Sequence, residues 1–177
     1  TFLNKEDKIR YKEKIFNNSF NINKNDKKKL IWFHAASIGE LNSIVPLINK
    51  LNEKQEYEFL ITTVTLSSSK LIKKLFNGKN IIHRFFPIDK TNLILNFLNN
   101  WSPDLIIFVD SEIWPNFLLE IKKRKLPLVL LNARITKKTF MKWKLISSFA
   151  SKIFQTFKLC LVSNHESKKY LEFFKAH

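Results

Sequence analysis

The chain has 177 residues, of which 45% are hydrophobic, and its formal net charge is +16. This length suits one domain of ordinary size with an apolar core, and no apolar run approaches the roughly 20 residues of a membrane-spanning helix. The single cysteine, Cys160, excludes an internal disulfide, and its apolar neighbours favour a small core residue in a reducing compartment. The charged start, "TFLNKEDKIRYKEK", lacks the apolar segment of a signal peptide.

Residues 1–30 are polar and basic, with nine Lys/Arg against four Asp/Glu, and we expect an N-terminal basic arm or helix that lies on the domain. Apolar runs of strand length then recur along the chain at six places: Leu30–Ala36, Phe59–Val64, Asn80–Phe86, Leu105–Val109, Leu126–Leu131 and Leu159–Val162. These runs are continuous instead of alternating, which is typical of parallel strands covered on both faces.

Helical patterns separate the apolar runs. Two of these patterns place apolar residues at i, i+3, i+4 and i+7: Ile44, Leu47, Ile48 and Leu51, then Ile94, Phe97, Leu98 and Trp101. Pro115 suits the first turn of a further helix. The alternation predicts an α/β fold with a doubly wound, Rossmann-like parallel sheet over residues 31–177 and right-handed crossovers.

Ligands of open α/β sheets bind beyond the carboxyl ends of the strands, where the strand order reverses. If the six runs are ordered 3-2-1-4-5-6, the first and fourth are neighbours, and the loops that follow them are "ASIGE" and "VDSEIWPN". Each loop carries a glutamate just past the strand end, Glu40 and Glu112. We therefore expect two carboxylates to converge on one crevice.

Ordinary structural roles stay open for the residues of these loops. A glutamate at position 40 stabilises a helix start through the helix dipole, and Ser111 and Asn116 suit helix caps. Gly39 permits either a tight turn or a close approach of a ligand to the backbone, but no glycine-rich nucleotide motif surrounds it. His34 lies inside a strand and favours a hydrogen-bonded core role, and we predict no metal site because the other histidines lack partners at ligand spacing.

The segment from Lys122 to Lys144 contains nine Lys/Arg and no Asp/Glu. Such a local excess indicates an anionic partner, and the aromatic residues among the lysines form a candidate membrane-contacting face: Phe140, Trp143, Phe149 and Phe154. Two classes of function stay open on this basis. One is an enzyme with an anionic substrate, and the alternative is a basic α/β module that binds nucleic acid or anionic lipid without catalysis. No recognised nucleic-acid motif supports nucleic-acid binding.

Three motifs then identify a resemblance: "WFHAASIGE", "SEIWPN" and "LLNARIT". In this order and spacing they resemble the N-terminal half of the 3-deoxy-D-manno-octulosonic acid (Kdo) transferases of lipopolysaccharide synthesis, from about Lys5 to the chain end. The resemblance implies half of a two-domain GT-B glycosyltransferase. Such an enzyme moves Kdo from CMP-Kdo to the lipid A precursor lipid IVA, with inversion and without a cofactor, at the cytoplasmic face of the inner membrane.

The same resemblance implies roles for individual residues. Glu40 is the expected general base, which takes the proton from the attacking hydroxyl, and Glu112 is the expected second active-site carboxylate. The residues expected to bind the acceptor are Ser37, Gly39, Ser111, Trp114, Asn116 and Arg134. Among these, Arg134 suits a bidentate contact with an acceptor phosphate. The anionic membrane surface is a further expected partner.

The chain also departs from the family pattern. The loop after the second apolar run, Thr62–Lys70, contains neither Pro nor Gly, and Asp110 stands where the family often has Glu. The final segment, "HESKKYLEFFKAH", resembles the last helix before the donor domain. We therefore expect the C-terminal CMP-Kdo domain and the N-terminal membrane anchor to be absent, and the chain by itself to be inactive.

Overall fold

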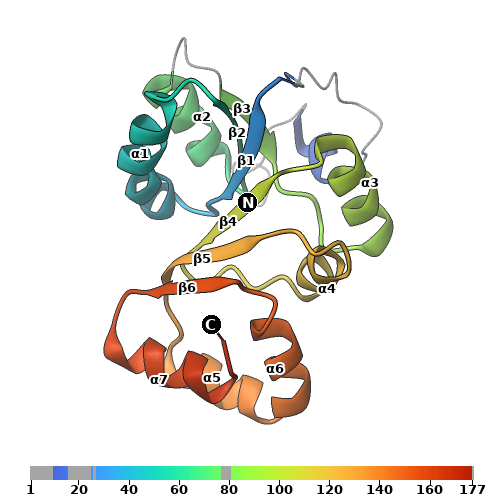
Figure 1. Ribbon diagram of the computed structural model, residues 1–177, viewed down its shortest axis with the longest axis vertical. Coiled ribbons are helices and arrows are strands. Elements are labelled where there is room, and N and C mark those ends of the chain that lie inside the picture. Colours follow the sequence, from blue (N-terminus) through green and yellow to red (C-terminus); the bar gives the residue numbers. More distant parts are fainter. Residues whose placement is uncertain (1–9, 16–24, 26, 77–80, 177) are drawn as a thin grey trace, which may run out of the picture.

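The computed structural model describes residues 10–15, 25, 27–76 and 81–176. They form one six-stranded parallel sheet in the order β3-β2-β1-β4-β5-β6, with helices on both faces (Figure 1). The strand order assumed from the sequence is the one that the structure has, so that β1 (Lys29–His34) and β4 (Leu105–Val109) are neighbours at the point of reversal. The other strands are β2 (Tyr57–Thr63), β3 (Ile81–Phe85), β5 (Leu128–Ala133) and β6 (Leu159–Val162).

Two helices cover each face of the central strands, and three more gather at one edge of the sheet. One face carries α1 (Ile38–Asn52) and α2 (Leu66–Leu75), and the other carries α3 (Thr91–Trp101) and α4 (Pro115–Lys123) (Figure 1). Three further helices gather on the β6 side of the molecule: α5 (Lys137–Lys144), α6 (Ser147–Phe154) and α7 (His165–Phe173). Within the described ranges, every helix is too short or too polar to cross a bilayer.

Alternate residues of the four central strands, β2, β1, β4 and β5, enter different cores, which explains why their apolar runs are continuous; the apolar residues of the edge strand β6 are largely exposed. Trp32 of β1 points to the α3–α4 side, where its ring lies 4.9 Å from that of Phe97 and 5.6 Å from that of Phe117. The next residue, Phe33, enters the core beneath α1 and α2. Burial on both faces holds the central strands, and with them the loops at their carboxyl ends, in a single geometry.

Several predicted boundaries are wrong by a few residues. β5 begins at Leu128, two residues late, because Leu126 closes the turn after α4 with a hydrogen bond to the Ile121 carbonyl (3.2 Å) and Pro127 has no N–H to donate. The strand then runs on to Ala133. β1 begins at Lys29, inside the predicted arm, and ends at His34, before the turn into α1.

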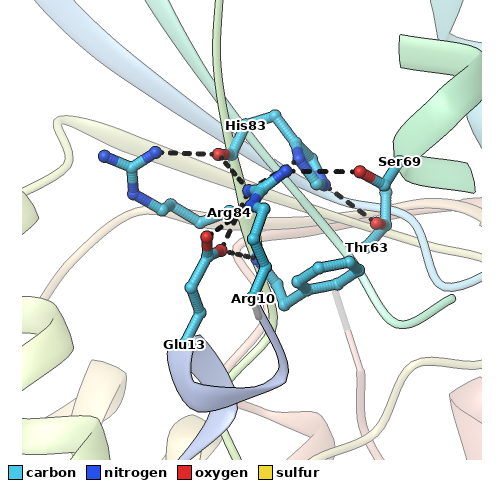
Figure 2. Close-up of polar contacts among 7 residues, drawn as sticks. Arg10, Glu13, Thr63, Ser69, His83 and Arg84 are labelled. Atoms are coloured by element: carbon cyan, nitrogen blue, oxygen red, sulfur yellow. Dashed lines mark hydrogen bonds and ion pairs between the residues drawn. The ribbon is translucent and has the colours of Figure 1, made fainter. Parts of the chain in front are cut away.

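Part of the predicted arm forms a 3-10 helix, η2 (Arg10–Lys14), which lies against β3. Arg10 donates to the Ser69 hydroxyl (3.3 Å) and to the His83 carbonyl (3.1 Å), and it pairs with Glu13 (Figure 2). Glu13 in turn accepts the Phe85 N–H (2.9 Å). Apart from residues 10–15, 25 and 27–30, the predicted arm falls outside the described residues.

His83 lies half-buried at the centre of this contact. Its Nδ1 lies 3.1 Å from the Arg10 guanidinium and its Nε2 lies 3.0 Å from the Thr63 hydroxyl (Figure 2). Burial lowers the pKa of His83 from 6.5 to about 3, and the positive charges of Arg10, Arg84 and Lys73 contribute in the same direction. The ring is therefore neutral at physiological pH.

Candidate active site

Glu40 lies in the first turn of α1 and takes part in the helix cap. The N-cap residue is Ser37, whose hydroxyl accepts the Glu40 N–H (3.2 Å) and donates to Glu40 Oε1 (2.7 Å). Glu40 Oε2 accepts the Ala36 N–H (2.8 Å). These reciprocal contacts resemble a capping box. A carboxylate has about four acceptor sites, so Glu40 can serve the helix start and still accept a hydrogen bond from a ligand.

Gly39 is exposed, and the fold does not require a glycine there. A Cβ added at this position would meet only the Ser37 hydroxyl, at an ordinary contact distance of 3.9 Å, and the backbone does not adopt the left-handed region. Of the two explanations for Gly39, the one by which a tight turn requires glycine is therefore wrong. A close approach of a ligand to the backbone stays a prediction.

Glu112 lies between β4 and α4 and is half-buried. Its Oε2 lies 3.0 Å from His34 Nε2 and accepts from Trp114 Nε1 (2.7 Å). Burial acts to raise the pKa of the Glu112 carboxyl, but its contacts with His34 and Trp114 outweigh burial and hold the pKa below its ordinary value. Glu112 is therefore ionised at neutral pH. Within the described part of the chain, its Oε1 has no hydrogen-bond partner.

Both carboxylates are held at the carboxyl end of β1. Glu112 bonds the ring of His34, the last residue of the strand, and Glu40 bonds the amide of Ala36, two residues further on. The strand order places the loop after β4 beside the loop after β1, as the expected convergence requires. That the two carboxylates share one crevice stays a prediction. His34 is fully buried and hydrogen-bonded as expected, but its contact with Glu112 was not predicted.

Trp114 and Asn116 are both committed to contacts inside the protein. Trp114 is the N-cap residue of α4 and packs against Phe86, with ring centroids 5.1 Å apart. The side-chain amide of Asn116 donates to the Asp89 carbonyl (2.9 Å), while the Asp89 carboxylate accepts the N–H groups of Asn116 (3.2 Å) and Phe117 (3.0 Å). Asp89 therefore occupies the N-terminus of α4, a role that sequence reasoning missed.

The loop after β5 reaches the same end of the sheet. Arg134 is exposed, its N–H donates to the Asp110 carbonyl (3.4 Å), and its guanidinium bonds none of the described residues. The Asn132 side chain donates to the Ser43 hydroxyl (3.2 Å), which donates to the Glu40 carbonyl (2.7 Å). Asn132 and Asp110 both have positive φ, at 54° and 63°, and only a few per cent of residues other than glycine do so.

Ser111 and the threonine-rich loop after β2 contribute less to the site. Ser111 is exposed, and its carbonyl accepts the Ile113 N–H (2.9 Å). In the loop after β2, Thr65 caps α2 by accepting the Ser68 N–H (3.2 Å), as a helix start requires. Across the ranges that the structure describes, no three His, Cys, Asp or Glu side chains are grouped to hold a metal ion.

The basic segment after β5 exposes a different apolar surface from the one expected. Phe140 stacks on Tyr170, Trp143 packs against Phe154, and Phe154 is fully buried, so these three do not form the predicted face. The exposed apolar residues surround the turn between α5 and α6, and we call them the α5–α6 corner: Met141 (50% exposed), Leu145 (85%), Ile146 (51%) and Phe149 (39%). Lys137, Lys138, Lys142 and Lys144 lie on the adjoining helix.

Cys160 lies in β6, away from both glutamates, and is half-buried. Burial raises the pKa of its thiol to about 12, so the thiol is inert at neutral pH. It lines a cavity of about 430 Å³ between β6 and α7. β5 separates this cavity from β4 and the Glu112 loop.

Residues 10–177 match the model of a family described as 3-deoxy-D-manno-octulosonic-acid transferase (kdotransferase). A 3-deoxy-D-manno-octulosonic acid transferase of Rickettsia bellii (strain RML369-C) is 36% identical over 172 residues, which are 96% of this chain and 40% of that protein. A probable mitochondrial 3-deoxy-D-manno-octulosonic acid transferase of Arabidopsis thaliana is 40% identical over 115 residues, 64% of this chain and 26% of that protein. The chain thus spans less than half the length of these relatives.

Solved structures show the same fold at low sequence identity. A putative UDP-N-acetylglucosamine 2-epimerase from Listeria monocytogenes has a TM-score of 0.58 at 12% identity, and the match covers 85% of this chain and 42% of the epimerase chain. The UDP-GlcNAc 2-epimerase from Neisseria meningitidis has a TM-score of 0.55 at 14% identity, and the match covers 85% of this chain and 44% of the epimerase chain. With the sheet order, this confirms the predicted doubly wound, Rossmann-like fold of the GT-B type.

Proposed function

Since the chain belongs to the 3-deoxy-D-manno-octulosonic-acid transferase family, we propose that it is the acceptor-binding part of an inverting glycosyltransferase. The reaction moves Kdo from CMP-Kdo to a lipid A precursor, lipid IVA, in lipopolysaccharide core biosynthesis. One observation carries the proposal beyond the family: the carboxylates of Glu40 and Glu112, from two motifs distant in sequence, are both held at the carboxyl end of β1.

Glu40 is the proposed general base. As the acceptor hydroxyl attacks the anomeric carbon of Kdo, its proton passes to the Glu40 carboxylate, and CMP leaves with the electron pair of the broken bond. A positioned base of this kind contributes about 10²- to 10⁴-fold to the rate. Glu112 stays ionised and uses its free Oε1 to orient the attacking sugar.

The acceptor is proposed to bind across the loops after β1, β4 and β5. Arg134, which is exposed and unpaired among the described residues, suits an acceptor phosphate. Ser37, Gly39, Ser111 and Trp114 are proposed to contact the acceptor beside the carboxylates. Asn116 is proposed to contribute through its side-chain oxygen, because its amide hydrogens face Asp89. CMP-Kdo is proposed to bind outside residues 1–177, and no cofactor is required.

The anionic membrane surface is the further proposed partner, at the cytoplasmic face of the inner membrane. The α5–α6 corner supports this proposal because it combines exposed apolar side chains with lysines and no acidic residue. Apolar groups enter the interface of a bilayer while lysines attract its anionic headgroups. Such a surface would hold the protein where its lipid acceptor is found.

Glu40→Gln in the full-length protein tests the proposed base. A capping box accepts Gln as well as Glu, so this variant should keep the start of α1 while losing the group that takes the proton. We expect Kdo transfer from CMP-Kdo to lipid IVA to fall about 10²- to 10⁴-fold, with unchanged circular dichroism and thermal unfolding. The matched control is Glu53→Gln at the exposed opposite end of the same helix. Normal turnover by Glu40→Gln would overturn the assignment.

A further inference from the structure

We propose that Trp32, Thr62 and His34 form a directed chain of hydrogen bonds that fixes the protonated nitrogen of His34 and thereby positions Glu112. The inference rests on the proposed role of Glu112 in transfer. All three side chains are fully buried, so His34 is a positioning residue and touches no substrate. The ring of His34 is further held by Phe86, which stacks on it at a centroid distance of 3.8 Å.

The chain of hydrogen bonds starts from a group with only one possible role. The indole of Trp32 can only donate, and its Nε1 donates to the Thr62 hydroxyl oxygen at 2.9 Å. The Thr62 hydroxyl then has one hydrogen and two candidate acceptors. His34 Nδ1 lies 3.0 Å away and the Phe33 carbonyl lies 3.4 Å away. The shorter contact makes the stronger hydrogen bond, so we assign the hydroxyl hydrogen to His34 Nδ1.

A neutral imidazole that accepts at Nδ1 must carry its hydrogen on Nε2. That nitrogen faces Glu112 Oε2 at 3.0 Å and so donates to it. The opposite neutral form, with the hydrogen on Nδ1, would set the lone pair of Nε2 against the ionised carboxylate. Its Nδ1–H would also face a Thr62 hydroxyl oxygen (3.0 Å) that already accepts the Trp32 indole, and a Thr62 carbonyl (3.2 Å) that already accepts the Ala35 N–H (3.0 Å).

The direction of these hydrogen bonds determines how Glu112 is held. His34 Nε2 and Trp114 Nε1 donate to the same oxygen, Oε2, from two sides. The carboxylate is thereby fixed at one oxygen, and Oε1 is left for the acceptor. If Nε2 lost its hydrogen, one of these two donors would be gone and the carboxylate could rotate. Positioning errors of about 1 Å at a reacting centre cost on the order of 100-fold in rate.

The test compares two substitutions of Thr62 in the full-length protein. Thr62→Val keeps the shape but removes the hydroxyl, whereas Thr62→Ser keeps the hydroxyl. We expect kcat for Kdo transfer to fall about 10- to 100-fold in Thr62→Val and to recover most of its value in Thr62→Ser, with little change in KM for lipid IVA. Thr156→Val is the matched control, because it removes another buried hydroxyl from the end of α6, away from both glutamates.

Nitrogen-15 spectra of the histidine rings, assigned with His34→Gln, give a readout that a purely structural role would not move. We expect the wild-type protein at pH 7 to show His34 protonated on Nε2 only, and Thr62→Val to lose this preference. A wild-type ring protonated on Nδ1 only, or on both nitrogens, overturns the proposal, as does equal kcat in Thr62→Val and Thr62→Ser. If the wild-type protein transfers no Kdo, the proposed function fails, while the spectrum still decides how His34 is protonated.

Discussion

At the scale of single residues, Gly39 is a position where the fold does not require glycine but a bound ligand could. It lies one residue before Glu40, in the first turn of α1, where glycine has no conformational advantage and a methyl group would fit. Glycine inside a helix is less stable than alanine by about 0.5–1 kcal/mol. A glycine that the backbone does not require leaves room for an acceptor that passes close to the backbone.

Gly39→Ala should therefore improve stability and impair function. We expect the free energy of unfolding in urea to rise by about 0.5–1 kcal/mol, while kcat/KM for lipid IVA falls because the new methyl group blocks the approach. Asn42→Ala, at an exposed position of the same helix, is the matched control. If Gly39→Ala keeps the full kcat/KM, no ligand passes at that point.

The sequence predicts the two glutamates but not the residues that hold them. Glu40 and Glu112 follow strand-length runs, so parallel strands place both at the carboxyl edge, and strand order alone decides that their loops are neighbours. The contacts of Glu112 with His34 and of Asp89 with Asn116 join residues 78 and 27 positions apart. No local spacing reports such pairs, because side-chain direction at a loop is decided by tertiary packing. His34 therefore looked like an ordinary core residue.

At the scale of elements, the sequence indicates the strands more clearly than the two helices between β5 and β6. Each strand is marked by its continuous apolar run, and only β5 starts two residues late, after Pro127. In α5 and α6, by contrast, apolar residues point both inward and outward: Phe140 packs against Tyr170 while Leu145 is 85% exposed. Without a single apolar stripe, the periodicity indicates neither helix clearly.

The contact of η2 with β3 leads to a prediction about acid stability. The unfolded chain takes up a proton on His83 near its ordinary pKa of 6.5, whereas the folded chain does so only at a pKa of about 3. Stability therefore rises with pH through this window and is lost on acidification, at roughly 1 kcal/mol per pH unit. His83→Gln should flatten this dependence between pH 6 and about pH 4, measured by urea unfolding.

His165→Gln serves as the control for this experiment, because His165 is exposed at the start of α7. It should leave the acid dependence of the parent protein unchanged. An equal dependence in the parent and in His83→Gln would show that His83 does not carry the effect.

At the scale of the whole molecule, the net charge of +16 acts together with the α5–α6 corner. Charge alone attracts any polyanion, and its effect over distances beyond about 10 Å is screened at 0.1 M salt. Exposed apolar side chains add a contribution that salt does not remove. The combination distinguishes a bilayer from a purely electrostatic partner.

Leu145→Ser should weaken binding to vesicles that contain anionic lipid. Burying one leucine in an apolar phase contributes about 1.5–3 kcal/mol, so we expect roughly a tenfold or greater loss of partitioning in a vesicle sedimentation assay. Leu161→Ser removes an exposed leucine from β6 and is the control. Equal partitioning of the two variants would exclude the α5–α6 corner as the lipid contact. Added salt should weaken binding of all forms.

The cap of α1 has a consequence for the order in which the site is assembled. The side-chain hydrogen bonds of Glu40 reach no further than four residues along the chain, so they can form with a single turn of helix. Glu112 instead meets a histidine 78 residues away, and it can do so only after β1 and β4 have paired. Glu40, the proposed base, can therefore be oriented by residues next to it in the sequence. Glu112 can be oriented only after β1 and β4 have paired in the middle of the sheet.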